Sequence, residues 1–207
     1  MIKRIIFDLD NTLIMWKYSY KNAIKKTIEY YKLDVDYLLV DEVIEEYENY
    51  YDKYTKENMT ELINKKFDLN LETDFIDKWL KELSIMSDED KNLVETLDYL
   101  SQKYELVVLT NWFKESQLNR MKHIKIDKYF KEIYGGDNFI KPNPISYKTA
   151  CGNRNLEECI MIGDNYKTDI EGALNIGMKA IMITNKDIEE TNNLKVIKNI
   201  KELKEIL

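Results

Sequence analysis

Carboxylate side chains stand in two places where an apolar run of this sequence ends. The pairs are Asp8 with Asp10, after Arg4–Phe7, and Asp164 with Asp169, after Cys159–Ile162. Residues i and i+2 of an extended segment point the same way, so Asp8 and Asp10 should project together. One such acid is more often a helix cap or a turn former, but the whole set would need several coincidences.

A cluster of four carboxylates needs positive charge. Two carboxylates about 5 Å apart repel by roughly 3 kcal/mol at an effective dielectric constant near 20. A hard divalent cation relieves that repulsion, and Mg²⁺ prefers a few carboxylate oxygens with water and phosphate oxygens. With one histidine in the chain, His123, the acids point to Mg²⁺ and away from a histidine-rich zinc site.

A lysine and a threonine complete the candidate chemistry. Thr110 and Asn111 follow the apolar run Glu105–Leu109. The chain has 2 prolines, and both stand in the sequence Lys141-Pro142-Asn143-Pro144. A residue before proline is held extended, and a proline after a capping Asn suits the first turn of a helix. Lys141 is therefore expected on a stiff loop, although a solvated lysine in a helix-starting turn is the plainer interpretation.

Short apolar runs alternate with segments of helical period, and this alternation must position the polar residues. The predicted strands are Arg4–Phe7, Glu105–Leu109, Glu132–Tyr134, Cys159–Ile162, Lys179–Ile183 and Lys195–Ile197. The predicted helices between them are Asp90–Lys103, Phe113–His123, Ile145–Cys151, Tyr166–Asn175 and Asn199–Leu207. Such alternation predicts an α/β fold with a Rossmann-like, doubly wound parallel sheet. Ligands of open α/β sheets bind beyond the carboxyl ends of the strands, so Asp8, Asp10, Thr110 and Asp164 should meet.

The stretch 14–88 breaks this rhythm. It lacks good strand runs and reads as helices, for example Lys17–Tyr31, Asp36–Lys56 and Glu72–Ser84, so we interpret it as a helical insert. Tyr47, Tyr50, Tyr51 and Tyr54 have the spacing of one helix face, which predicts a core stripe. Trp16, Tyr18, Tyr20 and Lys21 could line a substrate entrance, although packing of the insert is the simpler expectation.

Composition limits the possible partners and the location. A net charge of −7 argues against nucleic acid, and the apolar runs are too short to span a bilayer. The N-terminus does not resemble a signal peptide, and Cys151 and Cys159 are expected as reduced thiols. We therefore expect a cytoplasmic protein, a monomer or homodimer, with no nucleic-acid or membrane partner; the net charge does not forbid a small anionic substrate.

Four motifs together resemble those of the haloacid dehalogenase-like hydrolase superfamily, of the phosphatase type with a helical cap. They are Asp8-Leu9-Asp10-Asn11-Thr12, Thr110-Asn111, Lys141-Pro142-Asn143-Pro144 and the run Gly163–Asp169. The resemblance implies a catalytic core at 1–13 and 89–207 and a cap domain at 14–88. Asn143 stands where the family usually has aspartate and Asn11 where glycine is common, which weakens assignment to any one subfamily.

The resemblance also implies a role for each residue. Asp8 would attack phosphorus to form an aspartyl-phosphate, and Asp10 would protonate the leaving oxygen and then activate water. Phosphoryl oxygens would be held at Thr110 and Asn111 and stabilised by Lys141. Mg²⁺ would bind Asp8, the backbone carbonyl of Asp10 and Asp164, and Asp169 would orient metal-bound water or Lys141.

Other activities on the same core stay open. A phosphomutase keeps every one of these motifs but should need a sugar phosphate and a phosphorylated activator. A dehalogenase of the family lacks a carboxylate equivalent to Asp10, and a non-catalytic binding protein usually loses the nucleophile or the metal-binding acids. The residues present therefore favour a phosphatase that hydrolyses a small phosphomonoester. An aromatic pocket that stacks a nucleobase is a further hypothesis, and the substrate itself is beyond the sequence.

Overall fold

Six parallel strands form one sheet in the computed structural model, which describes residues 1–207 except for the side chains of Lys17 and Val40. The strands are β1 (Arg4–Phe7), β2 (Glu105–Leu109), β3 (Glu132–Tyr134), β4 (Cys159–Gly163), β5 (Lys179–Ile183) and β6 (Leu194–Ile197). Their order in the sheet is β3-β2-β1-β4-β5-β6. The first strand is central, with Arg4 paired to Glu105 on one side and to Cys159 on the other. The carboxyl ends of β1, β2 and β4 therefore lie side by side.

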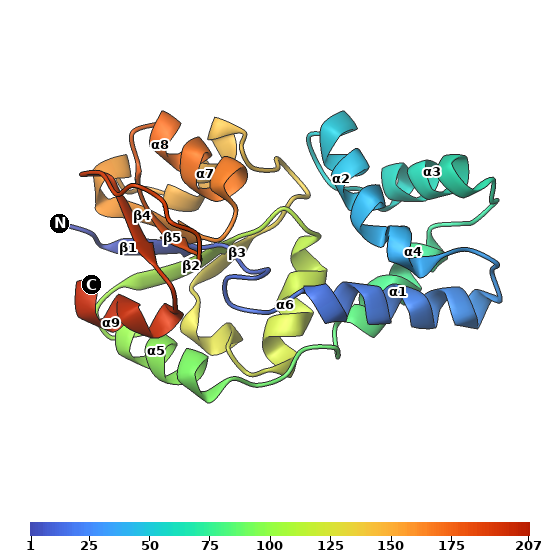
Figure 1. The fold of residues 1–207 in the computed structure, drawn as a ribbon, viewed down its shortest axis with the longest axis horizontal. Helices are drawn as coiled ribbons and strands as arrows, with labels where there is room; N and C mark the ends of the chain where they lie inside the picture. Colours follow the sequence, from blue (N-terminus) through green and yellow to red (C-terminus); the bar gives the residue numbers. More distant parts are fainter.

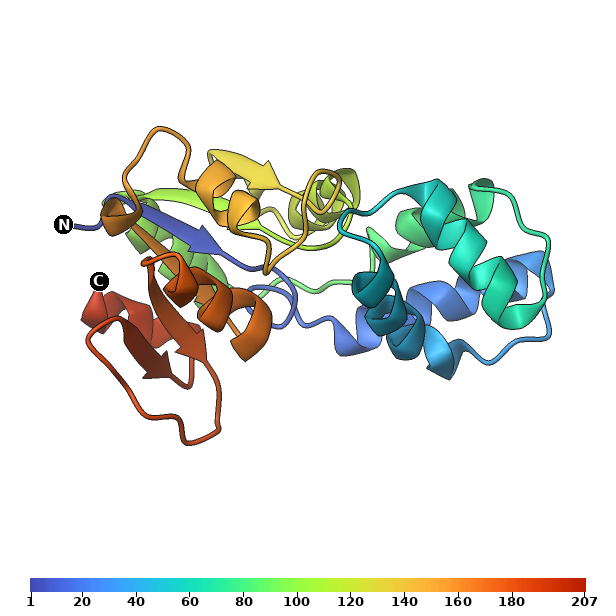
Figure 2. The same ribbon diagram turned by 90° about the horizontal axis from the view of Figure 1, so that it is seen from above.

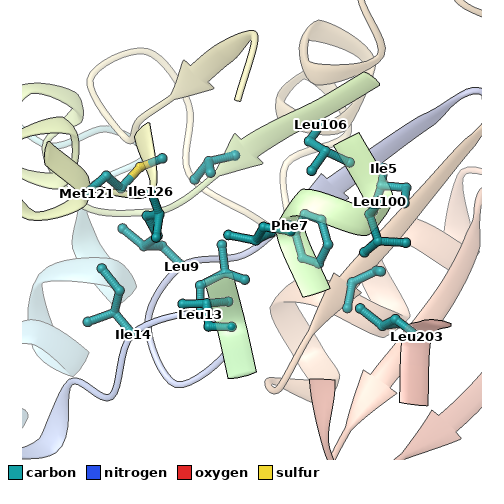
Figure 3. Close-up of a cluster of buried hydrophobic side chains, with 14 of the residues drawn as sticks. Ile5, Phe7, Leu9, Leu13, Ile14, Leu100, Leu106, Met121, Ile126 and Leu203 are labelled. Atoms are coloured by element: carbon teal, nitrogen blue, oxygen red, sulfur yellow. The ribbon is translucent and has the colours of Figure 1, made fainter. Parts of the chain in front are cut away.

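Helices cover both faces of the sheet (Figure 1). Side chains alternate across a strand, so Ile5 and Phe7 face one layer and Ile6 faces the other. The first layer holds α5 (Lys91–Ser101) and α9 (Leu203–Ile206), and the second holds α7 (Pro144–Cys151) and α8 (Gly172–Asn175). Figure 3 shows Ile5 and Phe7 with Leu106 of β2, Leu100 of α5 and Leu203 of α9 in one apolar cluster. The Rossmann-like, doubly wound sheet expected from the sequence is confirmed.

Four helices between β1 and α5 form a separate body beside the sheet (Figure 2). They are α1 (Lys17–Tyr31), α2 (Val40–Tyr50), α3 (Lys56–Phe67) and α4 (Asp74–Leu83). These helices bury their own apolar cluster, which includes Ile24, Phe75 and Trp79. Trp112, Phe113 and Ile140 of the sheet-bearing part join this cluster and hold the two bodies together. No helix of the described residues is long and apolar enough to cross a membrane.

One predicted helix of the insert, Asp36–Lys56, is wrong. The chain forms α2 up to Tyr50, leaves the helix and starts α3 after Thr55, whose side chain accepts a hydrogen bond from Asn58 N at 3.2 Å. The break is held by distant backbone: Tyr54 N donates to Gly136 O at 2.7 Å, and Ile140 N donates to Asp52 O at 3.0 Å.

The predicted stripe of tyrosines on one helix face is also wrong, because the helix that would carry it ends at Tyr50. Tyr47 and Tyr54 are buried and stacked with ring centroids 4.5 Å apart, but they come from the helix and from the extended break. Tyr50 is 74% exposed. The regular spacing of these tyrosines therefore does not reflect one helix face.

Two helix starts explain how the loops after β3 and β4 are held. Pro144 opens α7, and the Asn143 side chain accepts a hydrogen bond from Ile145 N at 3.0 Å, as its sequence predicts. After β4, Asn165 caps a wide π-helical turn, Tyr166–Glu171, that leads into α8. A π turn inside a helical segment is rare and is often found at functional sites.

Candidate active site

A cavity of about 180 Å³ opens at the carboxyl ends of β1, β2 and β4. Every residue with a predicted role lines it: Asp8, Asp10, Thr110, Asn111, Lys141, Asp164 and Asp169. Its other wall comes from the helical body and the loops beside it, through Trp16, Tyr20, Ile44, Glu48, Tyr54 and Trp112. The cavity is smaller than the sites that hold drug-sized ligands, so it suits a small molecule.

Lys141 lies between two carboxylates at the bottom of this cavity. Its Nζ donates to Asp8 Oδ1 and to Asp169 Oδ1, both at 2.6 Å. All three side chains are nearly inaccessible to solvent, and Lys141 is 3% exposed. Burial disfavours the ammonium, but Asp169 and Asp8 outweigh it and raise the pKa of Lys141. The lysine is therefore a fixed cation at the strand edge.

Asn111 fixes the backbone that carries Lys141. Its Oδ1 accepts a hydrogen bond from Lys141 N at 2.6 Å, and its Nδ2 donates to Lys141 O at 3.1 Å. The end of β2 is thereby tied to the loop that begins α7. Asn111 is thus a structural partner of Lys141 in this arrangement, in addition to lining the cavity.

Three acids form a cluster that could hold a metal ion. Oxygen atoms of Asp8, Asp164 and Asp169 lie within 4.8 Å of one another. Burial raises the pKa of Asp8 well above its usual range, and the Lys141 ammonium offsets this only in part. Burial and the nearby Asp169 raise the pKa of Asp164 to about 6. The three carboxylates are hard oxygen donors, the kind of ligand that Mg²⁺ prefers. Their closeness disfavours ionisation of all three together, and a bound cation would offset that cost.

Gly163 allows Asp169 to reach this cluster. A Cβ atom on Gly163 would lie 2.3 Å from Asp169 Oδ2, a distance at which one of the two must move. The same Oδ2 accepts a hydrogen bond from Asn165 N at 3.0 Å. The missing side chain at the end of β4 therefore makes room for the carboxylate that contacts Lys141.

The Asp10 side chain accepts hydrogen bonds from three side chains, two of which, Gln117 and Arg120, sequence reasoning missed. Arg120 Nη1 donates to Oδ1 at 2.6 Å, and Gln117 Nε2 and Tyr20 Oη donate to Oδ2 at 2.6 and 2.9 Å. Arg120 and Gln117 are completely buried, on α6 (Lys114–His123). Gln117 Nε2 also lies 2.9 Å from Thr110 Oγ1. A signal existed in the sequence, since the predicted helix 113–123 carries few apolar residues for a helix against a sheet.

The insert contributes Trp16 and Tyr20 to the cavity, whereas Tyr18 is 75% exposed and Lys21 forms an ion pair with Asp41.

Glu48 is a further residue that sequence reasoning missed. Its Oε1 accepts hydrogen bonds from Tyr54 Oη at 3.1 Å and from Asn111 Nδ2 at 3.3 Å.

The fold and the cavity define an α/β protein with a doubly wound parallel sheet and an acidic site at the strand ends, and comparison with known proteins gives its family. Residues 5–183 match the family model of haloacid dehalogenase-like hydrolases. The chain therefore belongs to the haloacid dehalogenase-like hydrolases, as the four motifs predicted.

Curated relatives of the chain are phosphatases. A glyceraldehyde 3-phosphate phosphatase of Methanothermobacter thermautotrophicus is 26% identical over the full length of both chains. A similar protein of Pyrococcus furiosus is 28% identical over 87% of this chain and 80% of its own length. A human N-acylneuraminate-9-phosphatase is 29% identical over 52% of this chain and 44% of its own length. These relatives confirm the predicted enzyme class, a phosphoric monoester hydrolase.

Solved structures agree on the fold. The HAD-hydrolase YfnB of Bacillus subtilis, solved with magnesium bound, superposes with a TM-score of 0.79 at 17% identity and covers 99% of this chain and 98% of its own. A HAD phosphatase of Thermococcus onnurineus superposes with a TM-score of 0.70 at 21% identity, covering 99% and 97%.

Proposed function

We propose that this chain is a Mg²⁺-dependent phosphatase that hydrolyses a small phosphomonoester through a phosphorylated Asp8. The observation that carries the proposal is the position of Asp8, which is buried in the cavity with its Oδ1 2.6 Å from the Lys141 ammonium. A fixed cation beside a carboxylate nucleophile suits a reaction in which negative charge develops on a transferring phosphoryl group. The phosphatase relatives support the same reaction class.

In the first step, the free carboxylate oxygen of Asp8 attacks phosphorus and the bond from phosphorus to the ester oxygen breaks. Asp10 gives a proton to the leaving oxygen, which departs as an alcohol. In the second step, Asp10 takes a proton from a water molecule as that water attacks phosphorus, the bond between phosphorus and the Asp8 oxygen breaks, and inorganic phosphate leaves with the Asp8 carboxylate restored. Tyr20, Gln117 and Arg120 all donate to Asp10, so this carboxylate has a defined orientation.

The remaining polar residues would bind and orient the phosphoryl group. Thr110 and Lys141 would contact its oxygens, and Asp169 would hold Lys141 in place through the 2.6 Å contact. The acids Asp8 and Asp164, with the backbone carbonyl of Asp10, would hold Mg²⁺. When bound, this ion supplies positive charge that compensates both the carboxylates and the substrate phosphate.

The helical body at 14–88 would act as a cap domain on a core made of 1–13 and 89–207. Its residues Trp16, Tyr20 and Glu48 reach the cavity, and such lids exclude water and select substrate. Glyceraldehyde 3-phosphate, named for the full-length relative, is a candidate substrate of suitable size. A cytoplasmic location and a monomeric or homodimeric state stay predictions from the sequence.

The test is a screen of phosphorylated metabolites with and without Mg²⁺, with wild type, Asp8→Asn and Asp88→Asn. The last variant changes an exposed acid outside the cavity and serves as a matched control. We expect phosphate release that needs Mg²⁺, is lost in Asp8→Asn and is kept in Asp88→Asn. Near-full activity of a folded Asp8→Asn variant would rule out the covalent route. Release of phosphate without a phosphorylated activator would separate a phosphatase from a phosphomutase.

A further inference from the structure

We infer that Glu48 makes the cavity selective for phosphomonoesters whose leaving group carries hydrogen-bond donors and no second negative charge. The inference rests on the proposed phosphatase activity and adds a substrate class to it. Glu48 belongs to α2 of the helical body and lines the same cavity as Asp8 and Lys141. It is a candidate specificity residue with no part in the bond-breaking steps.

Hydrogen bonds hold Glu48 close to the phosphate-binding end of the cavity. Asn111 Nδ2 donates both to Glu48 Oε1 at 3.3 Å and to the carbonyl oxygen of Lys141 at 3.1 Å. Tyr54 Oη donates to the same Oε1 at 3.1 Å. Asn111 thus links the Glu48 carboxylate to the loop that carries Lys141, in a cavity of about 180 Å³ that both residues line.

The second oxygen of Glu48 is available to a ligand. Oε2 accepts no hydrogen bond from the part of the chain whose side chains the structure describes. An ionised carboxylate only accepts hydrogen bonds, so its natural partner is a hydroxyl or an amine. A leaving group with a hydroxyl near the phosphate would supply that donor.

The cavity has few positively charged side chains that could bind a second anionic group on the substrate. Among the described residues that line the cavity, Lys141 is the one Lys or Arg, and Asp8 and Asp169 already engage it. The hollow next to the cavity is lined by three acids from one face of α2, Asp41, Glu45 and Glu48, and by two lysines, Lys141 and Lys167. Inside the cavity, a carboxylate on the substrate would therefore meet Glu48 with no Lys or Arg other than Lys141.

Two substrates with the same three-carbon skeleton test this charge selection. Glycerol 3-phosphate ends in a hydroxymethyl group, and 3-phosphoglycerate ends in a carboxylate. Measured at pH 8 with excess Mg²⁺, we expect kcat/KM of wild type to favour glycerol 3-phosphate by at least about 30-fold, in line with repulsion between carboxylates at short range. We expect Glu48→Gln, which keeps the shape, to reduce that ratio about tenfold, chiefly by lowering KM for 3-phosphoglycerate.

Glu46→Gln is the matched control, because it removes the same charge from the same helix but from an ion pair with Lys66 outside the cavity. It should leave the ratio unchanged. Equal kcat/KM of wild type for the two substrates, or an unchanged ratio in folded Glu48→Gln, would overturn the inference while leaving the phosphatase intact. Absence of Mg²⁺-dependent release from both substrates and from p-nitrophenyl phosphate would instead overturn the proposed function, and the inference with it.

Discussion

The Asp10 carboxylate accepts hydrogen bonds from three side chains, and Arg120 is the charged partner among them. The Arg120 side chain is completely buried, and that of Asp10 is 18% exposed. Burial disfavours the guanidinium, but Asp10 outweighs it and raises the pKa of Arg120. The pair therefore links the stability of α6 to the orientation of the proposed acid and base.

Replacing Arg120 with Met should destabilise the protein and impair the reaction. Removal of one partner leaves a largely desolvated carboxylate, and breaking a buried pair costs about 3–5 kcal/mol. Because Asp10 keeps Gln117 and Tyr20 and has some exposure, we expect a loss near the lower end of that range. Urea unfolding of the variant measures it.

A double-mutant cycle shows whether this loss belongs to the pair. With Asp10→Asn in the background, Arg120→Met should cost at least about 1 kcal/mol less than in wild type, since no carboxylate is then left unpaired. Equal losses in the two backgrounds would mean that Arg120 acts through packing alone.

At the scale of the element, the end of β4 depends on Gly163. We expect Gly163→Ala to push the Asp169 side chain away, because the added Cβ would lie 2.3 Å from Asp169 Oδ2. Misplacement of about 1 Å near a reaction centre can cost roughly 100-fold in rate. We therefore expect kcat to fall by about that factor in steady-state assays.

Asp169→Asn provides the comparison for this glycine. If the glycine acts by making room for Asp169, the double variant should be little slower than Asp169→Asn alone. Multiplied losses, or wild-type kcat in Gly163→Ala, would contradict that role.

Sequence periodicity predicts the sheet well and the helical body less well. The strands are buried on both faces, so their apolar runs are continuous and stand out, as in Cys159–Gly163. The break between α2 and α3 escapes prediction because its backbone bonds go to Gly136 and Ile140, more than 80 residues away in the chain. No local pattern carries that information.

The site residues also fall into two groups, those that the sequence predicts and those that it does not. Residues that directly follow strands, such as Asp8 and Asp164, can be placed from the sequence because strand ends share one edge of the sheet. Gln117 and Arg120 lie within a helix and Glu48 in the insert, where a polar residue is by default a solvated one. Only the packing of α6 and α2 around the cavity shows that they face inward.

At the scale of the whole molecule, the two bodies meet at Trp112, which the sheet-bearing part contributes to the apolar cluster of the helical body. Its ring contacts Tyr20 and Trp79 edge to face, with centroids 4.9 and 5.3 Å away. Tyr20 in turn donates to Asp10, so contact between the two bodies extends to the proposed catalytic acid. We therefore expect Mg²⁺ bound at the strand ends to stabilise the whole molecule against unfolding.

Without metal, ionisation of Asp164 should reduce stability. Its pKa is raised from the ordinary 3.8 to about 6, so the folded state holds this proton more tightly than the unfolded state. The contribution of Asp164 to stability is then lost as the pH rises from about 4 to about 6. Mg²⁺ binds the ionised form and must displace the proton at low pH.

Thermal unfolding at two pH values tests this coupling. We expect 10 mM Mg²⁺ to raise Tm by several degrees at pH 7.5 and by much less at pH 5. Asp164→Asn should lose most of the Mg²⁺ effect at pH 7.5, whereas Asp88→Asn should keep it. The same shift at both pH values would show that the ion does not bind these carboxylates.

The chemistry proposed for Asp8 has a direct signature. Wild-type enzyme mixed with a ³²P-labelled phosphomonoester and Mg²⁺, and quenched in acid within the first turnover, should carry label on the peptide that contains Asp8. The label should be released by hydroxylamine, as expected of an acyl phosphate, and should be absent from Asp8→Asn. Release of labelled phosphate in the same experiment with no label on the protein, or with label on another residue, would contradict attack by Asp8.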